Sequence, residues 1–369
     1  MMILNKQNKK KFGYCAVFLL AFVAGLTAQA EKVSVEKIQA DGVAKSVTGN
    51  SRNVQAVPAG DAAKTLKVFI LAGQSNMQGY GLAEASEKHP FDKPKGGLRW
   101  LIDNPKTGPD FAHLMDAGEN YVERDDVKIY YERTNTDIAS GNLAIGYGGH
   151  NPTEALVIGP EFGFGWGVGK SLDGPVLLLK TAWGAQSLSG DFRPPSSGGK
   201  CGHRYTQMVK IVHKVLDDIG SYFPEYKGFD YELAGFAWHQ GFSDLADDRV
   251  IHYEENLTNL INDLRKEFKV PDLPFVIGES GFHGWDNPKW DNGRMLRQAQ
   301  ANVCDSALHP EFAGKCGFVS SMPAHKQEYS GFNDASIHWF NSFFSYYTLG
   351  SDMGHEMVEL LQGHLGVSH

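Results

Sequence analysis

The chain has 369 residues, of which 42% are hydrophobic and 21% are charged, and its formal net charge is −8. This composition is typical of a folded protein that buries one large core or two smaller ones, and it argues against a disordered chain. A nucleic-acid partner would need a concentrated basic face, which the acidic balance does not predict.

The first thirty residues have the pattern of a secretory signal. A basic region precedes the apolar run "FGYCAVFLLAFVAGL", and "AQA" ending at Ala30 supplies the small residues of a cleavage site. We expect cleavage, a mature start near Glu31, and a secreted or periplasmic protein without a membrane anchor. The alternative is an uncleaved anchor, but the apolar run is short for a bilayer span of about 20 residues. Residues 31–64 show no sustained period and are expected to form a flexible leader.

Five short apolar runs follow at long intervals and predict the strands of a sheet. They read "LKVFILAG", "PVLLLKTAWG", "ELAGFAWHQG", "LPFVIGESG" and "CGFVSSM". Runs that are apolar throughout suit strands buried on both faces. Apolar residues at helical spacing between them predict helices over 208–219 and 257–268. The segment 341–364 is predicted as a last helix that is broken near Gly350 or Gly354. This alternation predicts one α/β domain over residues 65–369, with a mostly parallel five-stranded sheet between helices.

Two segments between the runs need their own explanation. The stretch 84–152 is too long for a simple connection, so we expect an insertion over one rim of the sheet. Glu161, in "IGPEFGFGWGVG", is expected to stabilise the start of a helix.

The cysteines suit an oxidising compartment. Cys304 and Cys316 are close enough in sequence to close a small loop, which leaves Cys201 unpaired in the mature chain. A zinc site is the rival interpretation, but the chain has no C-x-x-C pair, and His203 is the only histidine near Cys201 in the sequence. We therefore expect no metal.

Polar residues follow each apolar run, and this is where an open parallel sheet binds its ligands. Ser75 follows the first run, Gly184 the second and Gln240 the third, while His338 stands just before the last helix. A serine becomes a nucleophile when an imidazole takes its proton and amide donors hold the oxyanion. We predict Ser75 as nucleophile, His338 as base, and an oxyanion site made by the N–H groups of Ser75 and Gly184 and the side-chain amide of Gln240. Each residue alone has a simpler explanation, such as a helix cap for Ser75 or a core histidine for His338.

Three segments carry a family resemblance. "GQSNMQG", "KTAWG" and "WHQGFSD" resemble the signature blocks of the SGNH (GDSL-like) hydrolases, in the branch of sialate O-acetylesterases and the acetylxylan esterases of carbohydrate esterase family six. The resemblance implies a three-layer α/β/α, flavodoxin-like fold and the same roles for the four residues above. The third block departs from the usual pattern, because Phe242 stands where Glu is common.

The sequence offers several candidates for the acid that orients His338. The resemblance implies an Asp three residues before the histidine, where this chain has Ala335, and Asp334 lies four residues before. Asp334 is our first candidate, because a carboxylate on the second ring nitrogen fixes the tautomer and stabilises the imidazolium. Glu279, Asp244 and a Ser–His dyad without an acid are the alternatives.

The resulting prediction is a secreted serine esterase that removes O-acetyl groups from a carbohydrate such as sialic acid or xylan, without a metal or organic cofactor. Arg193 is placed to meet the carboxylate of an acidic sugar bidentately. The expected substrate contacts are Gln74, Asn76, Trp183, Gln186, Arg193 and His239. Two alternatives stay open: a lipase or thioesterase on the same fold, and a carbohydrate-binding protein whose serine site has decayed.

Overall fold

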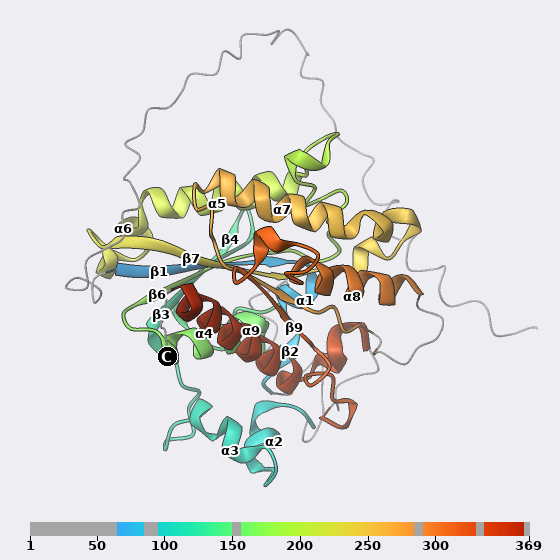
Figure 1. Ribbon diagram of the computed structural model, residues 1–369. Helices are drawn as coiled ribbons and strands as arrows, with labels where there is room; N and C mark the ends of the chain where they lie inside the picture. Colours follow the sequence, from blue (N-terminus) through green and yellow to red (C-terminus); the bar gives the residue numbers. More distant parts are fainter. Residues whose placement is uncertain are drawn as a thin grey trace, which may run out of the picture. The chain divides into compact units, whose positions relative to one another are not determined.

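A seven-stranded sheet forms the centre of the protein (Figure 1). The computed structural model describes residues 65–84, 95–149, 156–282, 284, 291–329 and 336–364, so the predicted signal and leader lie outside the described residues. The strands of this sheet are β1 (Thr65–Gly73), β3 (Arg124–Thr134), β4 (Asp137–Leu143), β6 (Val176–Ala182), β7 (Asp230–His239), β8 (Phe275–Gly278) and β9 (Cys316–Val319). They are arranged in the order β4-β3-β6-β1-β7-β8-β9. Only β4 runs antiparallel to its neighbour.

The five predicted apolar runs are β1, β6, β7, β8 and β9, and numbered along the chain they lie in the order 2-1-3-4-5. This is the flavodoxin-like order, in which the ligand site lies at the carboxyl ends of the strands where the winding reverses.

The predicted number of five strands was wrong, because β3 and β4 extend the sheet beyond β6. Both come from the stretch that we expected to be an insertion over one rim. Edge strands with one exposed face do not read as apolar runs, and β4 is largely exposed or half-buried.

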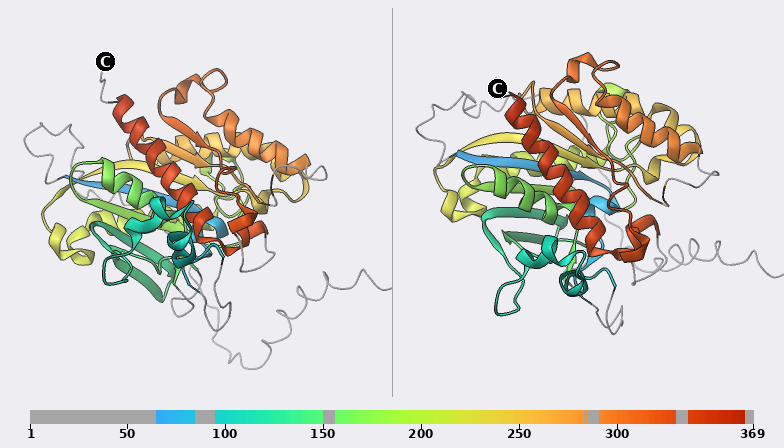
Figure 2. Two further views of the ribbon diagram at one scale, coloured as in Figure 1. Left: turned by 90° about the horizontal axis from the view of Figure 1, so that it is seen from below. Right: turned by 60° about the horizontal axis from the view of Figure 1, so that its bottom comes forward.

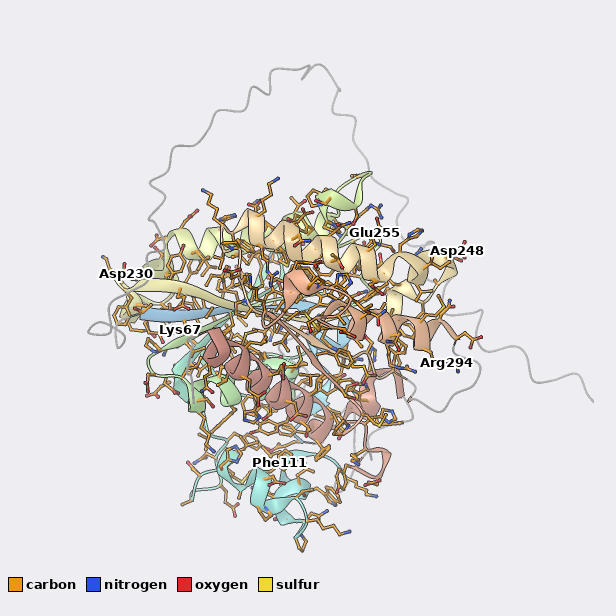
Figure 3. The ribbon with its side chains drawn as sticks, viewed as in Figure 1. Lys67, Phe111, Asp230, Asp248, Glu255 and Arg294 are labelled. Carbon is orange, nitrogen blue, oxygen red and sulfur yellow. A yellow bond between two sulfur atoms is a disulfide. The ribbon has the colours of Figure 1, made fainter. Side chains whose placement is uncertain are left out.

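Helices cover both faces of the sheet and complete three layers (Figures 1 and 2). One face packs against α4 (Pro160–Ser171) and α9 (Phe343–His364), and the other against α5 (His203–Asp217), α7 (Tyr253–Glu267) and α8 (Asp291–Val303). Side chains fill both interlayer spaces (Figure 3). Along β1, Val68 and Ile70 enter the core on the α5 side, while Phe69 and Leu71 enter the core on the α4 side. The predicted α/β class is therefore confirmed.

Short helices and a small second sheet connect these layers. The second sheet pairs β2 (Gly81–Leu82) with β5 (Val157–Ile158). The short α-helices are α1 (Ser75–Gln78), α2 (Leu98–Asp103), α3 (Gly108–Phe111) and α6 (Ile219–Tyr222). The 3-10 segments are η2 (Ala112–Leu114), η3 (Pro195–Ser197), η4 (Pro224–Tyr226), η5 (Phe242–Asp244), η6 (Asp247–His252), η7 (Pro310–Phe312), η8 (Gln327–Tyr329) and η9 (Ser336–Asn341).

The last helix, α9, is continuous, so the predicted break at Gly350 or Gly354 was wrong. These glycines instead let α9 approach α4 closely. A Cβ atom on Gly350 would lie 2.0 Å from the carbonyl oxygen of Pro160, and one on Gly354 would lie 2.8 Å from that of Phe164. Among the helices of the described ranges, none is both long enough and apolar enough to cross a membrane.

The ends of β1, β6 and β7 lie level with one another. Gly73, the last residue of β1, pairs with Ala182 of β6 on one side and with His239 of β7 on the other. A Cβ atom on Gly73 would lie 2.1 Å from the carbonyl oxygen of His239, so only glycine allows this approach. Lys67 and Asp230, labelled in Figure 3, mark the opposite edge of the sheet, where β1 and β7 begin. The residues that follow the three strands therefore emerge side by side.

A disulfide joins the end of α8 to the first residue of β9. Cys304 and Cys316 are bonded, with their Cα atoms 5.0 Å apart, and Cys201 is a free, half-buried thiol. This bond closes the small loop that the sequence allowed.

Candidate active site

Ser75 opens α1 immediately after β1. The residue before it, Gln74, occupies the N-cap position and makes no side-chain capping bond, so the serine is not the helix cap of the simpler explanation. Ser75 is 9% exposed. As the first residue of a helix, its N–H group has no intrahelical acceptor, and no other described residue accepts a hydrogen bond from it.

Gly184 occupies the matching position after β6. Trp183 donates its N–H to the carbonyl oxygen of Gly73 at 3.2 Å, which holds the chain leaving β6 beside the chain leaving β1. Gly184 is half-buried, and within the described ranges its N–H meets no acceptor. Two unpaired N–H groups, those of Ser75 and Gly184, therefore lie at neighbouring strand ends. This is the donor arrangement that an oxyanion requires.

Gln240 and Gln74 tie the end of β7 to the end of β1. The Nε2 atom of Gln240 lies 3.0 Å from Gln74 Oε1, 3.0 Å from the carbonyl oxygen of Gln186 and 2.7 Å from Asp244 Oδ2. Gln74 Oε1 also accepts the N–H groups of Gly241 and Ser243 at 3.2 Å. A donation from Gln240 to an oxyanion stays a prediction, and it requires that the substrate replace one of these acceptors.

Asp244 holds the loop that follows Gly184. It is fully buried, and its carboxylate accepts the N–H groups of Leu188 and Ser189 at 2.7 and 2.8 Å as well as the amide of Gln240. These three bonds explain why a carboxylate is buried here without a cationic partner among the described residues. Asp244 thus has a structural task apart from any role in orienting His338.

His338 lies in η9, and its segment contacts the turn that carries Ser75. The Nδ2 atom of Asn76 donates to the carbonyl oxygen of Ile337 at 3.0 Å. The ring of His338 stacks on that of Tyr80, with centroids 4.4 Å apart, and its carbonyl oxygen accepts from the hydroxyl of Tyr346 at 3.3 Å. Tyr80, two residues after α1, thus contacts the ring of His338, and Asn76, next to Ser75, holds the residue before this histidine.

The backbone after His338 is strained. Trp339, Phe340 and Asn341 have φ values of 48°, 57° and 57°, which L-residues rarely adopt. The fold fixes this turn, because Trp339 is fully buried and Asn341 Nδ2 donates to the carbonyl oxygen of Tyr80 at 3.0 Å. Strain of this kind gathers at functional sites, where the surrounding structure over-determines it.

Among the candidate orienting acids, Asp334 lies outside the described residues. Glu279, after β8, is 7% exposed, and its Oε2 accepts the hydroxyl of Ser320 at 2.8 Å and the N–H of Ser321 at 3.0 Å. Arg297 lies 3.9 Å from its other oxygen. The choice between these acids stays a prediction.

Four of the expected substrate contacts are buried side chains that bond to the protein itself. Gln74 and Asn76 make the bonds described above, and the indole of Trp183 donates to the carbonyl oxygen of Glu132 at 3.3 Å. His239 is 2% exposed, and its Nδ1 lies 2.9 Å from the carbonyl oxygen of Gly278. Burial lowers the pKa of His239 to about 4, so its ring is neutral at physiological pH. In this conformation the four side chains support the rim rather than face solvent.

The other two expected contacts, Gln186 and Arg193, are half-buried on the loop after β6. Arg193 donates to the carbonyl oxygens of Gly198, Ser189 and Ser197 at 2.7, 3.0 and 2.5 Å. Gln186 accepts from Arg204, whose guanidinium lies over the ring of Trp183. The sequence predicts that Arg193 binds a substrate carboxylate, and such binding would compete with these three carbonyl oxygens.

Sequence reasoning missed Lys180, a charged residue within the apolar run of β6. Lys180 and Glu161 are both fully buried, with Nζ 2.6 Å from Oε2. Glu161 Oε1 also accepts the N–H of Gly159 at 2.8 Å, which matches its expected place at the start of α4. The signal was present in the sequence, because a lysine in a run buried on both faces requires a partner.

The described residues contain no group of three or more His, Cys, Asp or Glu side chains that could hold a metal ion. The rim itself carries a hydroxyl, an imidazole and two main-chain N–H groups that have no acceptor among the described residues.

Comparison with known proteins identifies the family. A family model described as carbohydrate esterase, sialic acid-specific acetylesterase, matches residues 65–310. The chain belongs to this family. It is accordingly a carboxylic ester hydrolase that removes O-acetyl groups from carbohydrates, and the expected SGNH-type carbohydrate esterase is confirmed.

Individual relatives are distant. A probable carbohydrate esterase from Arabidopsis thaliana, At4g34215, is 25% identical over 225 residues, which cover 57% of this carbohydrate esterase and 67% of the relative. The X-ray structure of the Arabidopsis thaliana protein AT4G34215 superposes with a TM-score of 0.50 at 18% identity and covers 82% of this chain and 98% of its own. The structure of a carbohydrate acetylesterase from Xanthomonas citri gives a TM-score of 0.45 at 17% identity and covers 77% of this chain and 55% of its own. The Arabidopsis structure supports the assignment of the fold.

Proposed function

We propose that this esterase is a secreted enzyme that works through an acyl-enzyme on Ser75, with His338 as general base. The observation that supports this most is the hydrogen bond of 3.0 Å from Asn76 to the carbonyl oxygen of Ile337. It joins the neighbour of the proposed nucleophile to the neighbour of the proposed base.

The reaction proceeds in two steps. Ser75 Oγ attacks the carbonyl carbon of the acetyl group while the ring of His338 takes the hydroxyl proton. The tetrahedral intermediate then collapses, and the sugar oxygen leaves with the proton that His338 returns. In the second step His338 takes a proton from water, the resulting hydroxide attacks the acetyl-serine, and acetate leaves as Ser75 regains its proton.

The negative oxygen of each intermediate is held by the N–H groups of Ser75 and Gly184. Both N–H groups lack an acceptor among the described residues, so neither gives up a hydrogen bond when the oxyanion forms. Donors fixed in place before the reaction cost no reorganisation in the transition state, and the loss of one such donor typically lowers kcat by about 10²–10³.

O-acetylated sialic acid is the first substrate to test, because the description of the matching family model names it. Acetylated xylan is the second, from the resemblance of the signature blocks. The Xanthomonas citri protein is described as a carbohydrate acetylesterase, without a named sugar.

Export is part of the same proposal. We assign residues 1–30 to a cleaved signal peptide, 31–64 to a leader and 65–369 to the esterase domain. N-terminal sequencing of the protein from the extracellular or periplasmic fraction tests this, and a mature chain that starts at Met1 contradicts it.

The activity test measures acetate release from O-acetylated sialic acid and acetylated xylan, and the hydrolysis of p-nitrophenyl acetate. We expect release by the wild type and loss in Ser75→Ala and His338→Asn, with the exposed Ser221→Ala as the control. Acetate release that survives in Ser75→Ala contradicts the proposal. Hydrolysis of p-nitrophenyl acetate without release from any sugar favours a lipase or thioesterase, and no hydrolysis at all favours a binding protein.

A further inference from the structure

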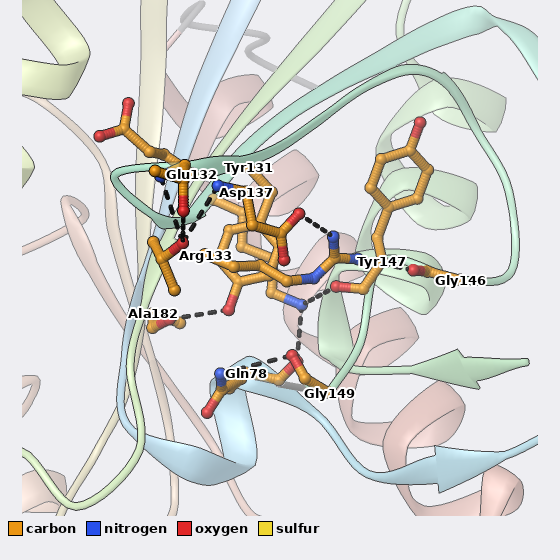
Figure 4. A network of polar contacts seen from close by, with 12 residues as sticks. Gln78, Tyr131, Glu132, Arg133, Asp137, Gly146, Tyr147, Gly149 and Ala182 are labelled. Atoms are coloured by element: carbon orange, nitrogen blue, oxygen red, sulfur yellow. Dashed lines mark hydrogen bonds and ion pairs between the residues drawn. The ribbon is translucent and has the colours of Figure 1, made fainter. Parts of the chain in front are cut away.

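A buried ammonium group contacts the end of the helix that Ser75 begins. Lys180 Nζ lies 2.8 Å from the carbonyl oxygen of Gln78, the last residue of α1, 2.8 Å from that of Tyr147, and 2.6 Å from Glu161 Oε2. These three acceptors use all three ammonium hydrogens. Figure 4 shows Gln78 and Tyr147 on either side of this network.

The same contacts join three segments that are far apart in sequence. Gln78 Nε2 lies 3.4 Å from the carbonyl oxygen of Gly149, and the N–H of Gly149 donates to the carbonyl oxygen of Gly79 at 2.9 Å. Arg133 donates to the carbonyl oxygen of Gly146 at 2.7 Å (Figure 4). The end of α1 and the segment 146–149 are thus fixed to the sheet by two cations.

The start of α4 closes the network from the other side. A Cβ atom on Gly159 would lie 2.4 Å from Glu161 Oε2, 2.9 Å from the carbonyl oxygen of Met77 and 3.1 Å from that of Gln78. Because the backbones touch here, a shift of the Glu161 carboxylate moves the last residues of α1. That helix has only four residues, so a displacement of its end is transmitted to Ser75 at its start.

We propose that Lys180 and Glu161 are positioning residues for the ester hydrolysis, which fix the turn that presents Ser75 to the substrate. The inference rests on the proposed function, since it takes Ser75 as the nucleophile. Neither side chain reaches solvent, so neither contacts the substrate. Their effect is exerted through the orientation of α1, and a displacement of about 1 Å at a reacting group is enough to cost about 10²-fold in rate.

The test removes both charges together. A single substitution leaves an uncompensated buried charge and risks unfolding, whereas replacement of both partners often preserves the fold. We expect Lys180→Met/Glu161→Gln to melt within about 4 °C of the wild type. We expect its kcat on p-nitrophenyl acetate to fall by about ten- to hundredfold with KM within about twofold, and labelling of Ser75 by a fluorophosphonate to slow by the same factor.

The matched control is Lys67→Met/Glu232→Gln, a Lys–Glu pair on β1 and β7 at the opposite edge of the sheet. We expect it to keep wild-type kcat. A folded Lys180→Met/Glu161→Gln enzyme with wild-type kcat overturns the inference. If Ser75→Ala keeps its activity, both the proposed function and this inference are contradicted. If Ser75→Ala is inactive but Lys180→Met/Glu161→Gln is as active as the wild type, only this inference is contradicted.

A measurement on the wild type covers the case in which the double variant does not fold. Burial, together with the charge of Arg133, lowers the pKa of Lys180 to about 8, against the attraction of Glu161. The other titratable groups that face Lys180 are Tyr131, whose pKa burial raises well above its usual range, and Tyr147, whose pKa burial raises to about 12. Both stay neutral between pH 7 and 10, so we expect kcat to fall as the pH rises through about 8. A kcat that stays level to pH 10 overturns the inference.

Discussion

The side-chain amide of Asn76 donates a hydrogen bond of 3.0 Å to the main-chain oxygen of Ile337, 261 residues further along the chain. The other end of the same amide, Asn76 Oδ1, accepts the hydroxyl of Tyr346 at 2.8 Å. One buried side chain thus connects the turn after β1 to η9 and to α9. The connection joins the neighbour of Ser75 to the neighbour of His338.

The first prediction concerns that connection. Asn76→Ala leaves the carbonyl of Ile337 and the hydroxyl of Tyr346 without this partner, so we expect the free energy of unfolding to fall by about 1–3 kcal/mol. We expect kcat on p-nitrophenyl acetate to fall by about tenfold or more, since the segment of the proposed base is no longer bonded to the turn of the proposed nucleophile. The control is Asn259→Ala on α7, which loses one bond to Ser197 Oγ. Full activity in Asn76→Ala would show that the connection is not needed.

The second prediction concerns the acid that orients His338. We expect Asp334→Asn to lower kcat by about 10²–10⁴, because the amide favours the wrong tautomer of the ring and cannot stabilise the imidazolium. Glu279→Gln and Asp244→Asn, assayed for acetate release beside it, provide the comparison. An unimpaired Asp334→Asn enzyme rules this choice out, and a larger loss in one of the others identifies that acid instead.

Asp244→Asn needs a separate readout, because its carboxylate accepts from Leu188, Ser189 and Gln240. An asparagine offers one acceptor oxygen in place of two, so we expect a loss of about 1–3 kcal/mol in unfolding free energy by urea titration. A variant that loses kcat at unchanged stability would instead indicate a direct role of Asp244 at the histidine.

The third prediction concerns Arg193, whose guanidinium bonds to three carbonyl oxygens of its own loop. If the loop is its main task, Arg193→Gln lowers kcat/KM by the same factor for an acidic and for a neutral acetylated sugar, and this is the result we expect. The measurement compares O-acetylated sialic acid with its methyl ester. A loss confined to the acidic sugar would instead support the carboxylate contact predicted from the sequence.

The fourth prediction concerns stability in acid. The pKa of His239 is about 4 in the folded protein, because the ring is buried, against 6.5 for an ordinary histidine. Between pH 6.5 and 4 the unfolded chain therefore binds a proton that the folded protein does not, and the free energy of unfolding falls as the pH falls. We expect this group to cost roughly 2–3 kcal/mol by pH 4.5, because one pKa unit is about 1.4 kcal/mol.

The measurement for this prediction is urea unfolding at pH 7 and at pH 4.5. His239→Asn keeps a donor for the carbonyl of Gly278 and removes the titrating ring, so it should lose less stability on acidification than the wild type. An equal loss in both proteins would contradict the assignment of this acid sensitivity to His239.

The sequence by itself determined the parts of the fold that depend on local burial. β1, β6, β7, β8 and β9 are buried on both faces, so each reads as a continuous apolar run, and parallel strands bring the residues after those runs to one edge. Helices α5 and α7 were predictable for a similar reason, since each buries one face. Ser75, Gly184 and Gln240 could therefore be brought together before any coordinates were known.

Tertiary structure decided what depends on partners distant in sequence. The edge strand β4 is largely exposed or half-buried and β3 carries charged residues along its length, so no apolar run marked either strand. Gly350 and Gly354 were taken as a break because the helix that they approach lies some 190 residues earlier. The hydrogen bonds of Gln240 and the ion pair of Lys180 with Glu161 likewise could not be predicted, because their partners are distant in the sequence. A buried polar group is stable only with its partners in place, and those partners are fixed by strand order and helix packing rather than by nearby residues.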